Sequence, residues 1–299
     1  MRLRIFLLLF IASRTLANQV SCEANNDFLY DCDEDYTHGT RIEYHLDSGW
    51  RFGVQQQMYT PTDLRPSDPV PGRHPYAGYL AGFVGYDNRG RSTWYDDVEL
   101  QLGVLGPSSH ADEVQRWVHK VLGCKYPAGW EHQLHDEAEV ELSYWKGLDL
   151  EMYRKGDFGV IGDVELGGLL GTYQIAAGAN ADLKIGLNPS NRRGDSEMSV
   201  RGPSGAPAKH GSEYEAYLVF GLEGRCWGRN ELMDGNAGYV HNGVYTTIDK
   251  ETWTGAAKAG FTVGYGSMRV NMLWLWLTKQ FETQEAKPHY ASMIVEWSF

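Results

Sequence analysis

Gln115 and His119 lie four residues apart in the segment Glu113–Gly123, whose residue pattern predicts a helix in a chain otherwise rich in strand-like stretches. This spacing puts both side chains on one helix face. An imidazole held beside an amide could act as the general base of a hydrolase, although a solvated surface histidine is the alternative. The apolar residues recur at helical spacing and predict the face by which the helix packs: Val114, Trp117, Val118, Val121 and Leu122.

A second group of polar residues begins near the N-terminus. Asn25, Asn26 and Asp27 are followed by a run of acidic residues, Asp31, Asp33, Glu34 and Asp35, and then by Tyr36-Thr37-His38-Gly39. Oxygen donors at this density suit a hard cation such as Ca²⁺, but their spacing is not that of an EF-hand. A solvated acidic loop is the alternative; it is preferred for Asp31 and Asp33, and both interpretations stay open for Asn26 and Asp27.

A turn-rich region from Met58 to Gly78 carries Arg65 and Arg73. A guanidinium group at such a rim could bind phosphate, although each residue could equally be a surface arginine. His132 and His135 are interpreted as loop residues. The sequence contains neither a Gly-x-Ser-x-Gly motif nor a phosphate-binding glycine loop, which argues against a serine hydrolase of that type and against a nucleotide site.

Composition and the first residues restrict the class of protein. The chain has 299 residues and a formal net charge of −12, which disfavours nucleic acid as a partner. Residues 1–17 have a basic start, a short apolar core and a small-residue end, and are predicted to be a cleaved secretory signal peptide. Residues 18–299 are predicted to form one domain. Export permits disulfides among Cys22, Cys32, Cys124 and Cys226; Cys22 and Cys32 could close a small loop, but the sequence does not give the connectivity.

Many segments of about ten residues alternate between polar and apolar side chains. In Asp97–Val104 the carboxylates and amide face one way and the aliphatic side chains the other, and Glu139–Tyr144 and Glu213–Phe220 repeat the pattern. A soluble sandwich would also alternate. The length of the segments, the 18 tyrosines and 10 tryptophans, and the terminal strand ending at Phe299 favour an antiparallel transmembrane β-barrel.

About twelve strands are expected. Their approximate ranges are 37–46, 49–58, 76–87, 92–104, 136–146, 158–169, 172–187, 213–225, 243–248, 252–265, 267–279 and 288–299. The polar stretch 188–212 is expected to be a loop. The insert 105–135 contains the predicted helix and is expected to lie outside the barrel wall.

Together these motifs resemble the family of outer-membrane lipid A 3′-O-deacylases. The resemblance covers residues 25–145 and depends on the order of several short motifs: Asn26-Asp27, Asp35-Tyr-Thr-x-Gly39, Tyr59-Thr-Pro61, Pro75-Tyr-Ala-Gly78, Gly103-Val-Leu-Gly-Pro107, Val114-Gln115-x-x-x-His119-x-x-x-Gly123 and Gly129-Trp130-x-x-Gln133-Leu134. The second half of the chain resembles the family in strand character and in its terminal Phe299.

The resemblance implies a twelve-stranded barrel in the bacterial outer membrane that hydrolyses the 3′-linked acyloxyacyl ester of lipid A, part of lipopolysaccharide, and depends on Ca²⁺. It implies that His119 is the general base with Gln115 beside it, and that Asn26, Asp27 and Thr37 surround the calcium. Arg65 is expected to contact the substrate.

The chain departs from the family pattern at two positions. Gly123 is followed by Cys124-Lys125-Tyr126 where the family has a glutamate, and Arg65-Pro66 stands where a lysine can follow the Tyr-x-Pro turn. Both differences concern contacts with the substrate rather than the base. The alternative functions are a non-enzymatic pore or scaffold barrel, with the helix as its plug, and a phospholipase A barrel, for which no serine is positioned by a motif.

Overall fold

The computed structural model describes residues 18–26, 35–89, 92–190, 214–236, 248–285 and 287–299. Within these ranges twelve antiparallel strands close into a barrel, each pairing with its neighbours in sequence, while β1 pairs with β12. The strands are β1 (Gln19–Asn26), β2 (Asp35–His45), β3 (Trp50–Thr60), β4 (Ala77–Asp87), β5 (Trp94–Leu105), β6 (Glu137–Lys155), β7 (Phe158–Gly171), β8 (Gln174–Leu187), β9 (Tyr214–Asn230), β10 (Trp253–Tyr265), β11 (Met268–Leu277) and β12 (His289–Ser298). The prediction of a twelve-stranded antiparallel barrel is confirmed.

The alternation of side chains along the strands decides which face meets lipid. On β5, Glu99 and Gln101 are buried inside the barrel, whereas Leu100 and Leu102 are exposed on its outer face. Leu166, Leu222 and Trp253 continue this apolar surface on other strands. An apolar exterior around a polar interior is the pattern of a barrel with lipid outside. Separately, none of the helices in the described part of the chain is long and apolar enough to cross a membrane.

The interior is filled by ion-paired side chains. Arg41 contacts Glu43 and Glu99 at 3.0 and 2.7 Å, and Arg51 contacts Asp97 and Glu99 at 2.8 and 3.0 Å. All of these side chains are at most 4% exposed. Because each buried charge has partners of the opposite sign, the layer can remain in the middle of the barrel.

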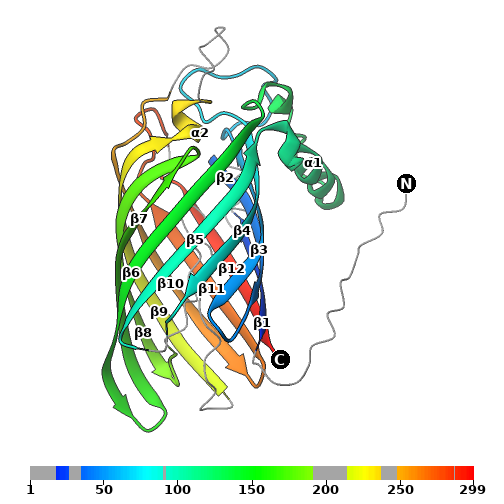
Figure 1. Ribbon diagram of the computed structural model, residues 1–299. Coiled ribbons are helices and arrows are strands. Elements are labelled where there is room, and N and C mark those ends of the chain that lie inside the picture. Colours follow the sequence, from blue (N-terminus) through cyan, green and yellow to red (C-terminus); the bar gives the residue numbers. More distant parts are fainter. Residues whose placement is uncertain (1–17, 27–34, 90–91, 191–213, 237–247, 286) are drawn as a thin grey trace.

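The two ends of the barrel differ. Figure 1 shows the chain ending at the opposite end from the helices α1 (Ala111–Leu122) and α2 (Glu231–Asp234). Exposed aromatic side chains gather on the strand ends nearest the C-terminus, as an interfacial girdle requires: Trp50, Trp94, Tyr265, Trp297 and Phe299. Short turns join β2 to β3, β6 to β7 and β10 to β11 at the terminal end, where the long stretch 188–213 also joins β8 to β9, and the inserts that carry α1 and α2 lie at the other end.

The predicted helix is α1, which begins two residues before the predicted start and ends at Leu122, with Gly123 as its cap. Gly123 has φ 73°, a left-handed conformation that costs glycine little and stops the helix. Two short 3-10 turns flank it, η2 (Pro107–Ser109) and η3 (Gly129–His132). The helix lies outside the barrel wall beside β3 and β4, as predicted for this insert (Figure 1).

One strand was not predicted. The stretch from Gln19 to Asn26 forms β1, which pairs with β12 and β2. Its outward residues Val20, Cys22 and Ala24 are small and its inward residues are polar. It therefore lacks the large apolar side chains by which the other strands were predicted. The strand expected at 243–248 lies almost wholly outside the described residues, as does the predicted signal peptide, residues 1–17. Cys22, Cys124 and Cys226 are free thiols, while Cys32 falls outside the described ranges.

Candidate active site

A β-bulge in β2 shapes the outer wall at the helix-bearing end. Ile42 is exposed on the outer face, and alternation puts His38 on the same face. The register shifts between Tyr36 and His38, leaving Thr37 as the extra residue. Tyr36 consequently turns inward, where its ring packs against Tyr290 with a centroid separation of 5.0 Å. The bulge therefore gives the outer face two consecutive polar side chains, Thr37 and His38.

Hydrogen bonds link Thr37 and His38 to the neighbouring strands. Asn26 donates from Nδ2 to the carbonyl oxygen of Thr37 at 3.2 Å and lies 3.3 Å from His38 Nδ1. The hydroxyls of Thr37 and Thr60 are 2.6 Å apart. Thr60 lies on the face of β3 that also carries the exposed Val54. Asn26 and Thr37, two of the predicted site residues, thus lie together on the outer wall.

The other predicted pair lies on α1, with an orientation that differs from the prediction. Gln115 and His119 are on the buried face of the helix, at 3% and 7% exposure, while Trp117 and Val121 of the apolar stripe are exposed at 65% and 62%. The expectation that this stripe packs the helix against the protein was wrong for these two residues. A helix beside a lipid-facing wall can leave apolar residues outside, because lipid rather than water can cover them.

His119 is held by the main chain that follows the helix. Its Nδ1 lies 2.5 Å from the carbonyl oxygen of Lys125. A carbonyl only accepts, so Nδ1 carries the proton and the neutral ring has its basic lone pair on Nε2. Gly123 ends the helix and lets the chain turn back, which brings Lys125 to the ring. This contact sets the tautomer that a general base requires.

Gln115 is oriented by Trp130 of η3. The indole Nε1 donates to Gln115 Oε1 at 2.6 Å, and both residues are buried. The amide nitrogen Nε2 of Gln115 is also buried and has no hydrogen-bond partner among the described residues. A buried donor without a partner is costly, so this atom is suited to receive an acceptor from a bound molecule.

Packing joins the helix to the wall that carries Asn26 and Thr37. Met58, which pairs with His38 in the ladder between β2 and β3, belongs to a buried cluster with Ala111 and Trp130. Gln56 donates from Nε2 to the carbonyl oxygen of Ser109 at 2.7 Å. The same strand surface therefore supports both halves of the predicted site.

Gly78 allows the start of the insert to approach β4 closely. A Cβ atom at this position would lie 2.1 Å from Ser109 Oγ and 2.4 Å from Ala111 Cβ. Such distances cannot be accommodated without moving the insert. Glycine at position 78 therefore sets how near α1 lies to the barrel wall.

Arg65 lies in the segment between β3 and β4. It forms an exposed bidentate pair with Asp63 at 2.8 Å, and the neighbouring Leu64 is buried in the cluster of Met58 and Trp130. Hydrogen bonds from Arg65 hold the pKa of Asp63 at about 2. The guanidinium is thus near the helix run-out, directed to solvent and partly neutralised by Asp63.

The donors near Asn26 fit a hard cation in chemical type. The hydroxyls of Thr37 and Thr60, the carbonyl of Thr37 and the amide of Asn26 provide oxygen donors on one small area of the wall. Asp27, the predicted carboxylate ligand, follows Asn26 directly but lies outside the described residues. The predicted calcium ligands stay a prediction.

Sequence reasoning assigned no role to His38, Thr60 and Trp130. Each lies inside a motif already noted, but their relation to the site depends on the bulge and on the folding of the insert. A histidine or threonine in a strand gives no sign of the neighbour that it will bond across a ladder.

Comparisons with known proteins agree with this architecture. The family model described as outer membrane protein LpxR matches residues 3–299. The structure of LpxR from Salmonella typhimurium is similar to this chain with a TM-score of 0.82 at 18% sequence identity, covering 94% of this chain and 100% of that one. No curated protein sequence matches.

Two other barrels resemble the chain far less. The β domain of the Bordetella autotransporter BrkA has a TM-score of 0.46 at 10% identity, with 95% of this chain and 99% of that chain covered. The KdgM porin has a TM-score of 0.42 at 6% identity, with 94% and 99% covered. Scores at this level support no inference about this chain.

Proposed function

The chain belongs to the family of the outer membrane protein LpxR, and on that premise we propose that it is a Ca²⁺-dependent esterase that removes the 3′-linked acyloxyacyl group of lipid A in the outer leaflet. The observation that carries the proposal is the 2.5 Å contact between His119 Nδ1 and the carbonyl oxygen of Lys125, which makes Nε2 the basic nitrogen of the neutral ring. His119 lies on the buried face of α1, and the cluster of Met58, Ala111 and Trp130 joins that helix to the wall that carries Asn26 and Thr37.

In this proposal His119 activates water. Nε2 takes a proton from a water molecule as the water attacks the ester carbonyl, and the Lys125 carbonyl stabilises the imidazolium that results. The proton then passes to the departing alkoxide oxygen, so that the ester yields a carboxylic acid and an alcohol. No serine nucleophile is needed for this route.

Gln115 is proposed to bind the ester. Its Nε2 amide group, without a partner among the described residues, would donate to the carbonyl oxygen or to the neighbouring acyl oxygen of the substrate. Trp130 fixes this donor by holding the other end of the amide. The arrangement costs little reorganisation when the substrate arrives, because the donor is already desolvated.

A calcium ion bound near Asn26 would polarise the ester carbonyl and stabilise the oxyanion. Asn26, Asp27 and Thr37 are the residues proposed to hold it. The Thr37–Thr60 hydroxyl pair and the bulge keep the oxygens of this part of the wall in place.

The exposed side of α1 supports a substrate that lies in a membrane. Trp117 and Val121 extend the apolar outer surface at the helix-bearing end, and Tyr126 in the run-out is also exposed. Such residues favour the boundary between lipid chains and headgroups. Arg65, directed to solvent nearby, is proposed to meet a phosphate of the lipid headgroup.

The filled interior disfavours the pore. Across the described strands, Arg41, Arg51, Glu99 and their partners are buried at the level where an open channel would need water-exposed side chains. Arg89 adds a second layer with Glu165 at 2.7 Å and with Asp163 at 3.4 Å. These salt-bridged layers are expected to block ions.

One experiment separates the enzyme from the pore. Purified full-length protein is assayed for acid release from lipid A in mixed micelles and for conductance in planar bilayers, with and without Ca²⁺. We expect calcium-dependent acid release and no stable conductance. Conductance steps without acid release, from protein whose barrel is shown to be folded, would contradict the proposal.

A further inference from the structure

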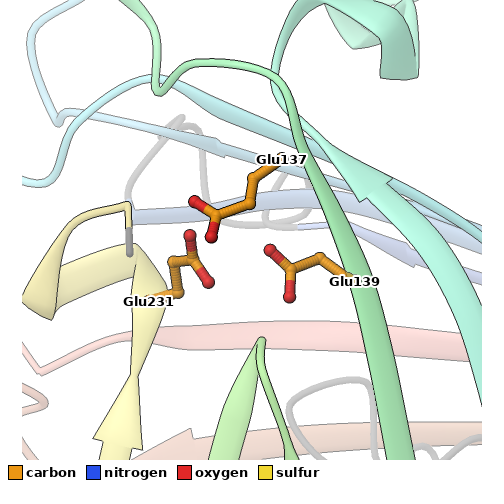
Figure 2. A group of neighbouring side chains, drawn as sticks. All are labelled: Glu137, Glu139 and Glu231. Carbon is orange, nitrogen blue, oxygen red and sulfur yellow. The ribbon is translucent and has the colours of Figure 1, made fainter. Parts of the chain in front are cut away.

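Three glutamates meet inside the mouth of the barrel, separate from the outer wall beside α1. Glu137 and Glu139 are on β6, and Glu231 begins α2 (Figure 2). One carboxylate oxygen of each lies within 4.8 Å of the others. Glu139 and Glu231 are buried, at 1% and 0% exposure, and Glu137 is half-buried. Three carboxylates at this separation repel one another strongly unless a cation or a shared proton lies between them.

The surrounding groups compensate only part of this charge. Arg229 approaches Glu231 at 3.4 Å, and Asn236 donates from Nδ2 to Glu137 and to Glu231 at 3.1 Å each. The hydroxyl of Thr172 donates to one oxygen of Glu139. Among the described residues, Arg229 is the one cationic side chain that an ion pair joins to the cluster.

One oxygen of Glu139 points to a missing ligand. Its Oε1 is buried and has no hydrogen-bond partner among the described residues. Figure 2 shows the carboxylate of Glu139 directed toward Glu231 and Glu137 rather than into the barrel wall. A buried carboxylate oxygen left in this way is costly, and a cation between the three groups would satisfy it.

We propose that Glu137, Glu139 and Glu231 bind a hard divalent cation, with Ca²⁺ the best fit, at a site separate from the proposed catalytic calcium. The donors are all oxygens, which such cations prefer. Oxygens that share one calcium at about 2.4 Å lie at most about 4.8 Å apart, and the three carboxylate oxygens lie within that limit.

The cation would connect two parts of the rim that are distant in sequence. In the sheet, β7 and β8 lie between β6 and β9. The turn that connects β7 to β8 is short, so α2, which follows β9, can reach across that turn to the start of β6. Asn236 already bridges the same two regions through the main chain of His135 at 3.0 Å. Because β6 begins where the insert that carries α1 ends, the cation would fasten that end of the insert to the barrel mouth.

Calcium binding to purified full-length protein tests this site. Bound ⁴⁵Ca²⁺ is counted by equilibrium dialysis for the parent chain, for Glu139→Gln and for Glu131→Gln, which changes an exposed carboxylate of the same insert. We expect Glu139→Gln to lose one bound ion per chain and Glu131→Gln to lose none. The rise of melting temperature with Ca²⁺ should shrink in the same variant.

Two further variants keep the outcome clear. Glu137→Gln changes a half-buried carboxylate, so it tests the site even where Glu139→Gln does not assemble; we expect at least a tenfold weaker binding of one ion. Asp27→Asn removes a ligand proposed for the catalytic calcium and should lose a different ion. If Glu137→Gln and Glu139→Gln bind as much calcium as Glu131→Gln, the carboxylates share a proton and the inference is wrong, whatever Asp27→Asn does.

Discussion

The imidazole of His119 donates from Nδ1 to the carbonyl oxygen of Lys125 across 2.5 Å, and this bond joins the last turn of α1 to the chain that leaves it. The bond places the basic lone pair on Nε2 and limits rotation of the ring. A residue arranged in this way is prepared to take a proton without first changing tautomer.

Replacing His119 with alanine is expected to lower ester hydrolysis by about 10²- to 10⁴-fold, the usual contribution of a general base. His132→Ala is the matched control, since His132 also bonds a main-chain carbonyl, that of Ser67 at 2.8 Å, but lies in the exposed part of the insert. Rates are measured on lipid A with barrel assembly checked by heat-dependent gel mobility. Full turnover in folded His119→Ala would exclude the mechanism.

Trp130→Phe is expected to lower kcat roughly 5- to 10-fold with little change in KM, because it removes a hydrogen bond worth about 1 kcal/mol from Gln115 and keeps most of the ring packing. A double-mutant cycle with Gln115→Met provides the control. The effect of Trp130→Phe should disappear once Gln115 is absent; equal effects in both backgrounds would mean that Trp130 acts through packing alone.

Gly78→Ala is expected to displace the start of α1 and to lower activity by about 100-fold, the scale of a 1 Å misplacement of reacting groups. Gly82→Ala on the same strand is the control, because its Cβ would meet nothing closer than Gly53 O at 3.9 Å. Both variants should assemble. Similar activity in the two would show that the approach of Ser109 and Ala111 to β4 does not govern the site.

The buried imidazole of His74 is expected to make the free energy of unfolding depend on pH. It is buried in the segment that connects β3 to β4, stacks on Tyr59 with ring centroids 5.4 Å apart, and burial lowers its pKa to about 4. In the unfolded chain its pKa is about 6.5, so between these values the unfolded state binds more protons. The contribution of neutral His74 to the free energy of unfolding is therefore complete above pH 6.5 and is lost as the pH falls toward 4. The total loss is up to about 3 kcal/mol.

Melting temperatures between pH 7.5 and 5 test this dependence. The parent and the half-buried control His132→Gln should both lose stability on acidification, whereas His74→Gln should show a flatter profile. An unchanged slope in His74→Gln would assign the pH dependence to other groups.

The sequence predicted the barrel because a wall with lipid on one side imposes strict alternation on every long strand. Asp97–Val104 shows this directly, with its carboxylates inside and its leucines outside. β1 escaped prediction because Val20, Cys22 and Ala24 give its outer face too little apolar surface to stand out. Alternation predicts strands where side chains are large and fails where they are small.

The site was predictable as a set of residues but not as a geometry. The motifs named Gln115, His119, Asn26 and Thr37, yet which face of α1 is buried depends on the solvent around it. Two residues of the apolar stripe, Trp117 and Val121, lie on the exposed side because lipid can cover them. The glutamate cluster was hidden for another reason: Glu231 lies 92 residues beyond Glu139 in the chain, and only the order of strands brings them together.

The most direct test is mass spectrometry of lipid A from bacterial outer membranes that contain this protein, incubated with Ca²⁺ or with a chelator. We expect loss of the 3′-linked acyl groups with Ca²⁺, and intact lipid A with the chelator or with His119→Ala. Intact lipid A in the presence of Ca²⁺ and a folded barrel, or loss of the acyl groups that persists with the chelator, would contradict the proposal.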